Sequence, residues 1–402
     1  MKLLRKITEK LMESLLTLSG AVTTAAVILI FAYLFREGLG IFSESPVEAR
    51  VVLAVHGSNP VKKLDADMIR KMYDGQITNW KEAGGPDLAV VPFYQSEITN
   101  YFSDSALGPE FANMPQCIGR LIDSMPGIIA AFDTSYTPRS FKGHFVQTGQ
   151  VSLISFLSGR NWYPTAKPAA QYGALPLLLG SLWVCIAAIL IALPLGLAAA
   201  IYISEIAKPR VRRILKPAVE LLAGIPSVVY GFFGLMVVVP AIQKLFDLEV
   251  GETGLAGSIL LAIMALPSII SVSEDALRST PREMKEASLA LGATHWQTIW
   301  RVVLPWSSSG IAAAAVLGIG RAVGETMAVL MVTGNAAVIP HSLLEPVRTL
   351  PATIAGELGE AAQGSAHSKA LFALGCLLFL ITLTFNLLVE YLVIRRRRAA
   401  GL

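Results

Sequence analysis

Long apolar runs separated by short polar segments make up most of this chain. An α-helix needs about 20 mostly apolar residues to cross the ~30 Å hydrocarbon core of a membrane. Runs of this kind occur at roughly 15–35, 175–203, 217–241, 254–273, 307–332 and 369–394. We therefore predict six transmembrane helices. The first run is too long for a signal peptide and no small-residue cleavage site follows it, so we interpret it as an uncleaved membrane anchor.

The stretch between the first and second runs has a different pattern. Residues 50–56 (RVVLAVH) and 87–94 (DLAVVPFY) have the short apolar character of strands, whereas 64–75 (LDADMIRKMYDG) and 96–107 (SEITNYFSDSAL) are typical of helices. This alternation predicts a small soluble α/β insert over residues 45–146.

Basic residues gather in alternate loops. Lys2, Arg5, Lys6 and Lys10 precede the first run, KPRVRRILK (208–216) joins the second to the third, and RRRR (395–398) follows the last. Lys and Arg favour the cytoplasmic side of a membrane. We therefore expect both termini and residues 275–305 in the cytoplasm, and the insert outside it.

Composition supports a membrane protein. Of the 402 residues, 53% are hydrophobic and 15% are charged, whereas a soluble domain has about a quarter charged residues. The net charge of +4 is too small to indicate nucleic acid as a partner. The three cysteines and five histidines have no ligand spacing, so we expect neither a disulfide nor a metal site.

One polar segment, EASLALGATHWQTIWRVVLP (286–305), lies between two apolar runs. Pro281 and Glu283 suit the start of a helix, and Gly292 would end it before a second helix reaches Pro305. The residues alone leave two readings open. The segment is an amphipathic connector, or it presents a small-residue face to a groove on a partner.

The spacing of this segment resembles the EAA loop of binding-protein-dependent ABC importer permeases. In that pattern EAA is followed by three residues, Gly, nine residues, an aliphatic residue, one residue and Leu-Pro. The matching residues are Glu286, Ala287, Ser288 (in place of the second Ala), Gly292, Val302, Leu304 and Pro305. The resemblance implies a coupling helix that docks on an ATPase subunit. The chain has no GxxxxGK[ST] motif, so the ATPase must be a separate chain.

Four further segments resemble phosphate ABC transporter permeases of the PstC type. They are YGALPLLLGSLWV (172–184), LLAGIPSVVYGFFGL (221–235), GRAVGETMAVLMVTGN (320–335) and SLLEPVRTLPATIAGELGEA (342–361). The resemblance implies a type I ABC importer permease fold in a bacterial inner membrane. It also implies a PstA-like second permease, a PstB-like ATPase dimer that binds ATP and Mg, and a PstS-like phosphate-binding protein. No cofactor and no catalytic residue are expected on this chain.

The resemblance divides the chain into four parts. We expect an anchor over 1–44, the α/β insert over 45–146, a link over 147–171 and a permease domain over 172–398, with its coupling loop at 275–305.

Two opposite charges fall inside the fifth run. Arg321 and Glu325 are four residues apart, so we expect them to share one helix face and to pair. Charges within a membrane usually face a bundle interior or a polar cavity, and a guanidinium matches the oxygens of phosphate. We predict that both residues contribute to an anion path. The alternative is a structural ion pair. Gly320 and Gly324 beside them are expected to form a close-packing face.

Three other charged residues are weaker candidates. Arg348 precedes a helix predicted to dip into the membrane, and it either contacts the anion at the outer mouth or lies at the surface. Glu205 and Glu220 are expected at the membrane interface, without a functional role.

Part of the insert resembles phosphate-binding proteins. Residues 59–102 contain a helix, a G-x-ITNW turn, a strand and the loop YQSEITNYF. In the family that loop contains Arg and Ser-Gly-Thr before a helix whose amides bind the anion. Here Arg and Gly are absent and Glu97 adds a negative charge. We therefore expect a degenerate lobe that contacts a binding protein or caps the outer mouth, without binding phosphate.

Two other functions remain open. The chain is a permease for another oxyanion, such as sulfate or molybdate, or a membrane-anchored phosphate sensor whose outer domain reports to a cytoplasmic partner.

Overall fold

The computed structural model describes residues 2–47 and 50–399, with side chains for 10–47 and 50–391. The chain forms two compact units. A helical unit contains the chain up to Gly38, Leu175–Ala361 and the chain from Leu371 onward. A mixed α/β unit contains Leu39–Ala174 and Ala362–Ala370.

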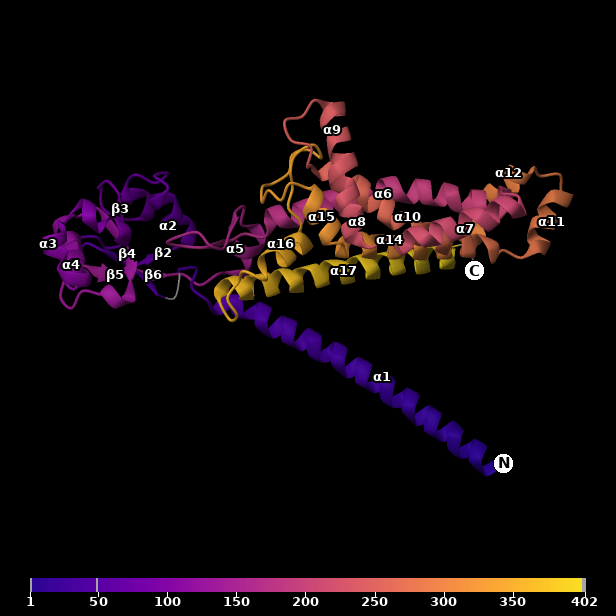
Figure 1. Ribbon diagram of the computed structural model, residues 1–402, viewed down its shortest axis with the longest axis horizontal. Helices are drawn as coiled ribbons and strands as arrows, with labels where there is room; N and C mark the ends of the chain where they lie inside the picture. Colours follow the sequence, from indigo (N-terminus) through magenta and orange to yellow (C-terminus); the bar gives the residue numbers. More distant parts are fainter. Residues whose placement is uncertain (1, 48–49, 400–402) are drawn as a thin grey trace. The chain divides into compact units, whose positions relative to one another are not determined.

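Among the described residues, five helical segments are long and apolar enough to cross a membrane. A sixth is obtained when a helix pair that bends by 70° at residue 307 is counted as one span. The helices concerned are α1 (Lys2–Leu39), α6 (Leu175–Ile201) with the π-helical η6 (Tyr202–Ile206), α8 (Ser227–Phe233) with η7 (Gly234–Val238) and α9 (Val239–Phe246), α10 (Gly254–Arg278), α14 (Ser308–Gly324) and α17 (Ala366–Ala399) (Figure 1). The chain is thus a multi-pass α-helical membrane protein.

The third span begins later than predicted. Residues 217–223 belong to a separate amphipathic helix, α7 (Pro209–Ala223), and the apolar span starts only at Ser227. Gly224 caps α7, and Ile225 precedes a proline, which disfavours helical backbone at that residue. The glycine and proline in LLAGIPS therefore divide one predicted helix into two.

The fifth span is also broken. The sequence predicts one helix over 307–332, but α14 ends at Gly324, Glu325 has extended backbone (φ −71°, ψ 131°) and a short helix, α15 (Met327–Val332), follows. Another short helix, α16 (Leu350–Glu357), precedes α17. Broken helices at membrane depth are tolerated where neighbouring protein or a polar cavity satisfies the freed backbone groups.

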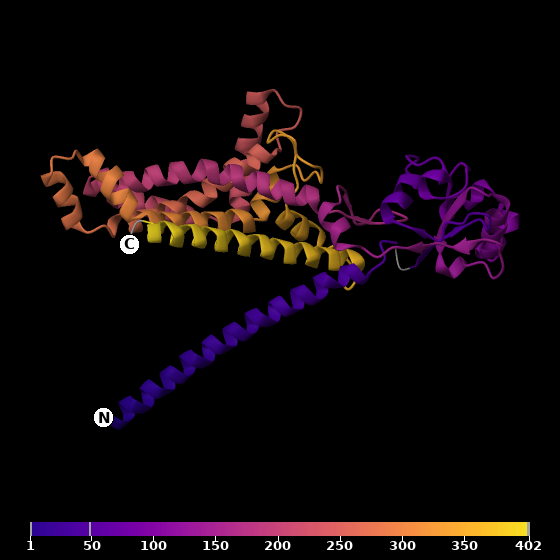
Figure 2. The ribbon, with the colours of Figure 1, turned by 180° about the vertical axis from the view of Figure 1, so that it is seen from behind.

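Small side chains pack the centre of the helical unit. Ala192 of α6 meets Ala262, Ala265 and Ile269 of α10 in one buried cluster. Small residues let helix backbones approach closely, which matters in a membrane because lipid is as apolar as the side chains themselves. Figure 2 shows α6, α14 and α17 of this unit from behind.

The α/β unit is built on a four-stranded sheet in the order β3 (Val91–Tyr94), β4 (Ile128–Asp133), β1 (Val51–Val55) and β5 (His144–Phe145). β4 pairs antiparallel with β1 and parallel with β3, and β1 pairs antiparallel with β5. Successive residues of a strand point to opposite faces. Leu53 and Val55 accordingly pack toward α2 (Ala66–Tyr73), whereas Ala54 packs toward α4 (Met114–Ser124).

Three of the four elements predicted in the insert are present as β1, α2 and β3. The helix predicted over 96–107 is wrong, because this segment forms a 3-10 helix, η3 (Gln95–Asn100), a turn, and a one-turn helix, α3 (Asp104–Leu107). Asn and Ser side chains compete for backbone hydrogen bonds and favour turns over continuous helix, which accounts for the break around Asn100 and Ser103.

Shorter elements complete this unit. They are η1 (Gly40–Ser43), β2 (Lys63–Leu64), η2 (Trp80–Ala83), η4 (Pro109–Phe111), η5 (Thr134–Tyr136), β6 (Gln147–Thr148), α5 (Leu153–Ser158), β7 (Trp162–Tyr163) and β8 (Gln171–Tyr172). β2 pairs with β6 in parallel, and β7 pairs with β8 antiparallel.

Candidate functional site

The polar segment between α10 and α14 forms a helical hairpin over residues 282–306. Its elements are α11 (Arg282–Ala290), α12 (His295–Thr298), the π-helical η8 (Ile299–Val303) and α13 (Leu304–Trp306). Pro281 caps α11 and Glu283 lies in its first turn, as predicted. Gly292 has φ +83°, a left-handed conformation that glycine adopts without strain. The predicted helix–glycine–helix is therefore present.

The second arm of the hairpin starts with a strong cap. The Thr294 hydroxyl accepts a hydrogen bond from the Gln297 backbone N–H at 3.2 Å, and the Gln297 side chain accepts one from the Thr294 backbone N–H at 2.9 Å. This reciprocal arrangement is a capping box, and it fixes the direction in which the chain leaves the turn at Gly292.

The EAA residues lie on an accessible part of the hairpin. Glu286 and Ala287 are exposed, whereas the Ser288 hydroxyl lies 3.0 Å from that of Thr298 and links the two arms. Large apolar side chains surround them, since Leu291 is 89% exposed and the Trp296 and Trp300 rings make an edge contact while more than half exposed. Exposed apolar groups of this size are typical of a surface that a partner covers.

Apolar packing fixes the base of the hairpin. Ile299 and Val303 are buried with Ala200 and Ile201 at the end of α6 and with Leu277 at the end of α10. Leu304, the Leu of the Leu-Pro pair, packs against this cluster, and Pro305 is exposed. Of the motif residues after Gly292, Leu304 thus helps to join the hairpin to the ends of two spans.

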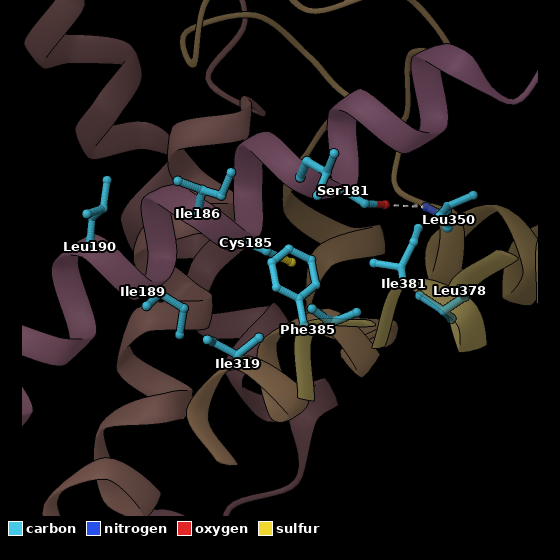
Figure 3. Close-up of a pocket in the computed structure, with 12 residues that line it drawn as sticks. Ser181, Cys185, Ile186, Ile189, Leu190, Ile319, Leu350, Leu378, Ile381 and Phe385 are labelled. Carbon is cyan, nitrogen blue, oxygen red and sulfur yellow. Dashed lines mark hydrogen bonds between the residues drawn. The ribbon is translucent and has the colours of Figure 1, made fainter. Parts of the chain in front are cut away.

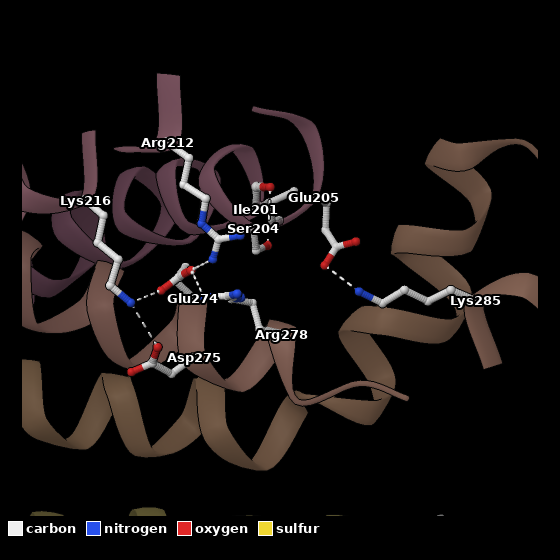
Figure 4. A network of polar contacts seen from close by, with 9 residues as sticks. All are labelled: Ile201, Ser204, Glu205, Arg212, Lys216, Glu274, Asp275, Arg278 and Lys285. Carbon is white, nitrogen blue, oxygen red and sulfur yellow. Dashed lines mark hydrogen bonds and ion pairs between the residues drawn. The ribbon is translucent and has the colours of Figure 1, made fainter. Parts of the chain in front are cut away.

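Two acidic residues beside the hairpin have a larger structural role than the sequence suggested. The Glu205 side chain is only 7% exposed and accepts a hydrogen bond from the Lys285 amine at 2.7 Å (Figure 4). The sequence places Glu205 at the membrane interface without a role. A lone glutamate in an otherwise apolar helix end was the available signal.

The second residue, Glu274, was not singled out in the sequence. Its side chain is 2% exposed and lies among Arg212, Lys216 at 2.7 Å and Arg278 at 3.5 Å (Figure 4). The hydrogen bond to Glu274 raises the pKa of the Lys216 amine above its ordinary value. A buried carboxylate needs such compensation, and here it ties α7 to α10.

Arg321 and Glu325 do not form the predicted pair. Arg321 lies in the last turn of α14, whereas Glu325 follows the end of that helix. Among the described residues, Arg321 makes no ion pair, and the Glu325 carboxylate instead accepts a hydrogen bond from the Ala328 backbone N–H at 3.3 Å. The break after Gly324 removes the i, i+4 relation on which the prediction depended. Both side chains are half-buried.

The predicted close-packing role of Gly320 and Gly324 is wrong for this chain on its own. A Cβ atom added at either glycine would meet no atom within 4 Å. The helix surface next to Arg321 is therefore open rather than packed.

Arg348 lies on a segment that is firmly attached to α6. Its guanidinium pairs with Glu357 of α16 at 2.9 Å, and the next residue but one, Leu350, donates its backbone N–H to the Ser181 hydroxyl at 2.8 Å. A Cβ atom added at Gly180 would lie 2.4 Å from the Arg348 carbonyl oxygen. Glycine at this position permits the close approach.

An apolar crevice lies between α6, α14, α16 and α17 (Figure 3). Its lining contains no Asp, Glu, Lys, Arg or His, and at one end the Ser181 hydroxyl accepts the hydrogen bond from the Leu350 backbone N–H. The lining residues are Ser181, Leu182, Cys185, Ile186, Ile189, Leu190, Ile319, Val323, Leu350, Leu378, Ile381 and Phe385. Without a charged donor this crevice cannot compensate an anion.

In the α/β unit, the loop that corresponds to the anion-binding loop of phosphate-binding proteins is YQSEITNYF (94–102). Its own side chains accept hydrogen bonds from nearby backbone N–H groups. The Glu97 carboxylate accepts a hydrogen bond from the Tyr94 backbone N–H at 3.3 Å, and the Gln95 side chain accepts one from the Asp133 backbone N–H at 2.7 Å. These contacts use donors at the mouth of a cavity that Arg50, Tyr94 and Asp133 help to line.

Comparison with known proteins agrees with both units. Residues 192–398 match the family described as binding-protein-dependent transport system inner membrane component. The chain belongs to this family. Residues 40–176 match a PBP superfamily domain, so the insert resembles part of a binding protein, as the sequence indicated.

The chain matches about four fifths of the length of each of the following relatives. The probable ABC transporter permease protein YqgH of Bacillus subtilis is 45% identical over 247 residues, 61% of this chain and 80% of the relative. The phosphate transport system permease protein PstC of Mesorhizobium japonicum is 39% identical over 261 residues, 60% of this chain and 79% of the relative. PstC of Xylella fastidiosa is 35% identical over 274 residues, 63% and 83% respectively. The chain is an ABC transporter permease component of the PstC type with a PBP-like insert.

Proposed function

We propose that this chain is the membrane-spanning permease subunit of an ATP-driven importer of inorganic phosphate. The hairpin over 282–306 supports this role most directly, because it combines the EAA spacing with an exposed apolar surface and a base packed into two spans. Phosphate as the substrate is supported by the relatives named phosphate transport system permease protein PstC. The name of the YqgH relative includes no substrate.

The proposed complex needs three kinds of partner. A PstB-like ATPase dimer, with its ATP and Mg, would dock on the hairpin. A PstA-like permease would complete the membrane unit, and a PstS-like protein would deliver phosphate. The PBP-like insert is a candidate contact for this last partner rather than a phosphate site, because Glu97 and Gln95 already accept hydrogen bonds from the backbone N–H groups of Tyr94 and Asp133.

The proposed orientation puts both termini and the hairpin in the cytoplasm of a bacterium, with the insert on the opposite side of the inner membrane. The basic residues that flank the spans support it, following the bias of Lys and Arg toward the cytoplasmic side.

Arg321 is the proposed anion contact within the membrane. It is half-buried, lacks an ion pair among the described residues, and lies beside the open helix surface at Gly320 and Gly324. A guanidinium without a carboxylate partner retains donors for phosphate oxygens. Glu325, four residues on, would moderate the positive field so that the anion does not stay bound. Arg348 is a weaker candidate for the outer mouth, because Glu357 already neutralises it.

The experiment is phosphate uptake by the complex reconstituted in proteoliposomes. Arg321→Gln is expected to lower uptake at least tenfold while the four-component complex still co-purifies, and Arg321→Lys should retain part of the activity. Lys244→Gln, at an exposed position in α9, is the matched control. Full uptake by Arg321→Gln would overturn the proposed path.

The same preparation separates the two alternatives. Uptake that sulfate or molybdate inhibits at equal concentration would indicate a permease for another oxyanion. Signalling that depends on phosphate, in a complex that never takes it up, would indicate a sensor.

A further inference from the structure

Glu205 contacts both arms of the hairpin. Its carboxylate binds the Lys285 amine of α11 at 2.7 Å, and its backbone carbonyl oxygen lies 3.2 Å from Nε2 of His295 in α12. Glu205 itself lies in η6, the π-helical turn that ends α6. One residue at the end of a membrane span therefore reaches both helices of the proposed ATPase-docking element.

The two arms differ in how they are held to the bundle. The second arm contributes Ile299 and Val303 to a buried apolar cluster. The first arm, α11, buries none of its residues. Polar contacts therefore help to fix its position relative to α6, and among the described residues the contact between Lys285 and Glu205 joins α11 directly to the end of α6.

Burial makes the Lys285–Glu205 contact stronger than an ion pair at the surface. Lys285 is 23% exposed and Glu205 is 7% exposed, so water screens the pair less than it screens a surface pair. Removing the carboxylate would leave a partly buried ammonium without its partner. Removing one partner of a buried ion pair destabilises a protein by more than the intact pair stabilises it.

We propose that Glu205 is the positioning residue that transmits movement of α11 to α6. This inference rests on the proposed function, because it requires an ATPase that moves the hairpin. When the ATPase displaces α11, the Lys285–Glu205 contact makes the end of α6 move with it. Without the contact, α11 can follow the ATPase while α6 stays in place, so ATP is hydrolysed with less transport.

The test measures phosphate transported per ATP hydrolysed by the reconstituted four-component complex. Glu205→Gln and Lys285→Gln are each expected to lower this ratio about tenfold, with the ATPase still co-purifying. The exchange variant, Glu205→Lys with Lys285→Glu, restores the opposite charges and should recover most of the ratio. A merely structural role would reduce the thermal stability of the complex but would not change the ratio in the complexes that remain.

Asp275→Asn is the matched control. Asp275 lies near the end of the span α10 and also pairs with a lysine, Lys216 of α7 at 3.3 Å. Among the described residues its side chain makes no polar contact with the hairpin, so the ratio should be unchanged. An unchanged ratio in Glu205→Gln, a lost ATPase subunit in that variant, or an exchange variant as defective as the single ones would each overturn the inference. Absence of phosphate transport by the unsubstituted complex would instead overturn the proposed function.

Discussion

The helical unit and the α/β unit distribute apolar and charged residues in opposite ways. In the helical unit, Leu190 is 70% exposed while the carboxylate of Glu274 is buried. In the α/β unit, Trp80 and Phe93 are fully buried, and the fully buried polar side chains among its described residues are uncharged, as in Asn59. The helical unit thus exposes large apolar side chains that the α/β unit would bury, and it buries a carboxylate as well as apolar groups.

The difference shows how the two solvents act on one chain. Water drives apolar side chains of the α/β unit into two cores, one on each face of its sheet. Lipid solvates Leu190 as well as a protein core would, so the helical unit is joined by close packing of small residues and by ion pairs at the span ends. Substitutions should therefore have unequal effects in the two units.

The largest effect is expected at the buried charge of the helical unit. Glu274→Ala leaves Arg212 without its carboxylate and Lys216 with Asp275 alone. It should destabilise that unit by about 3–5 kcal/mol, measured by thermal unfolding in detergent. Its neighbour Asp275 is 68% exposed, and Asp275→Asn should cost less than about 1 kcal/mol. Equal effects of the two changes would show that burial of the charge is irrelevant.

A similar loss is expected in the α/β unit when an aromatic side chain is removed. Trp80 is fully buried and its indole N–H donates to the Gly127 carbonyl oxygen at 2.8 Å. Trp80→Ala should destabilise this unit by about 3–5 kcal/mol and raise amide hydrogen exchange in α2 and β3. Trp183→Ala in α6, where the ring is 40% exposed, should leave exchange in α6 nearly unchanged.

A charge on an exposed residue should distinguish lipid from water. Leu190→Asp is expected to cost about 3 kcal/mol of membrane insertion, because a carboxylate replaces an apolar group at membrane depth. Insertion can be measured as the fraction of chain that resists alkaline extraction from membranes. Phe111→Asp in the α/β unit should be nearly neutral, since Phe111 is 44% exposed and has φ +59°, a conformation that Asp tolerates better. Impaired insertion by both variants would contradict the comparison.

The smallest effect is expected from alkaline titration of the α/β unit. Burial, followed by the nearby Glu44 charge, raises the pKa of Tyr172 to about 12. The unfolded chain would release this proton near pH 10, so the native state keeps it over a wider range. Stability should fall as the pH rises from about 10 toward 12 and should not change below that window. Tyr172→Phe should make this decline shallower, as monitored by unfolding in urea at each pH. Part of the decline should remain, because burial also raises the pKa of Tyr73 in this unit.

Local sequence was sufficient for much of the fold. The apolar runs gave α6, α10 and α17, because a membrane span is defined by its own length and hydropathy. The hairpin was predictable for a similar reason, since Pro281, Glu283 and Gly292 act on backbone only a few residues away. Two of the wrong elements lie where a short motif interrupts an apolar run, as Pro226 and Glu325 do. The third, the helix predicted over 96–107, lies in a polar segment that Asn100 and Ser103 break.

The same distinction between local and distant residues applies to the candidate functional site. The EAA residues could be found from spacing, whereas the contacts of Glu205 with Lys285, 80 residues away, and of Arg212 with Glu274, 62 residues away, could not. Nothing within the sequence of either segment specifies its partner. The proposed pairing of Arg321 with Glu325 failed because it assumed an unbroken helix.

By itself the sequence determined that the chain enters a membrane, where it turns, and which hairpin it presents, because hydropathy, proline and glycine act locally. The tertiary structure alone decided which buried charges meet and which glycines remain open. A charge removed from water can be satisfied only by whatever the packing of distant helices brings beside it.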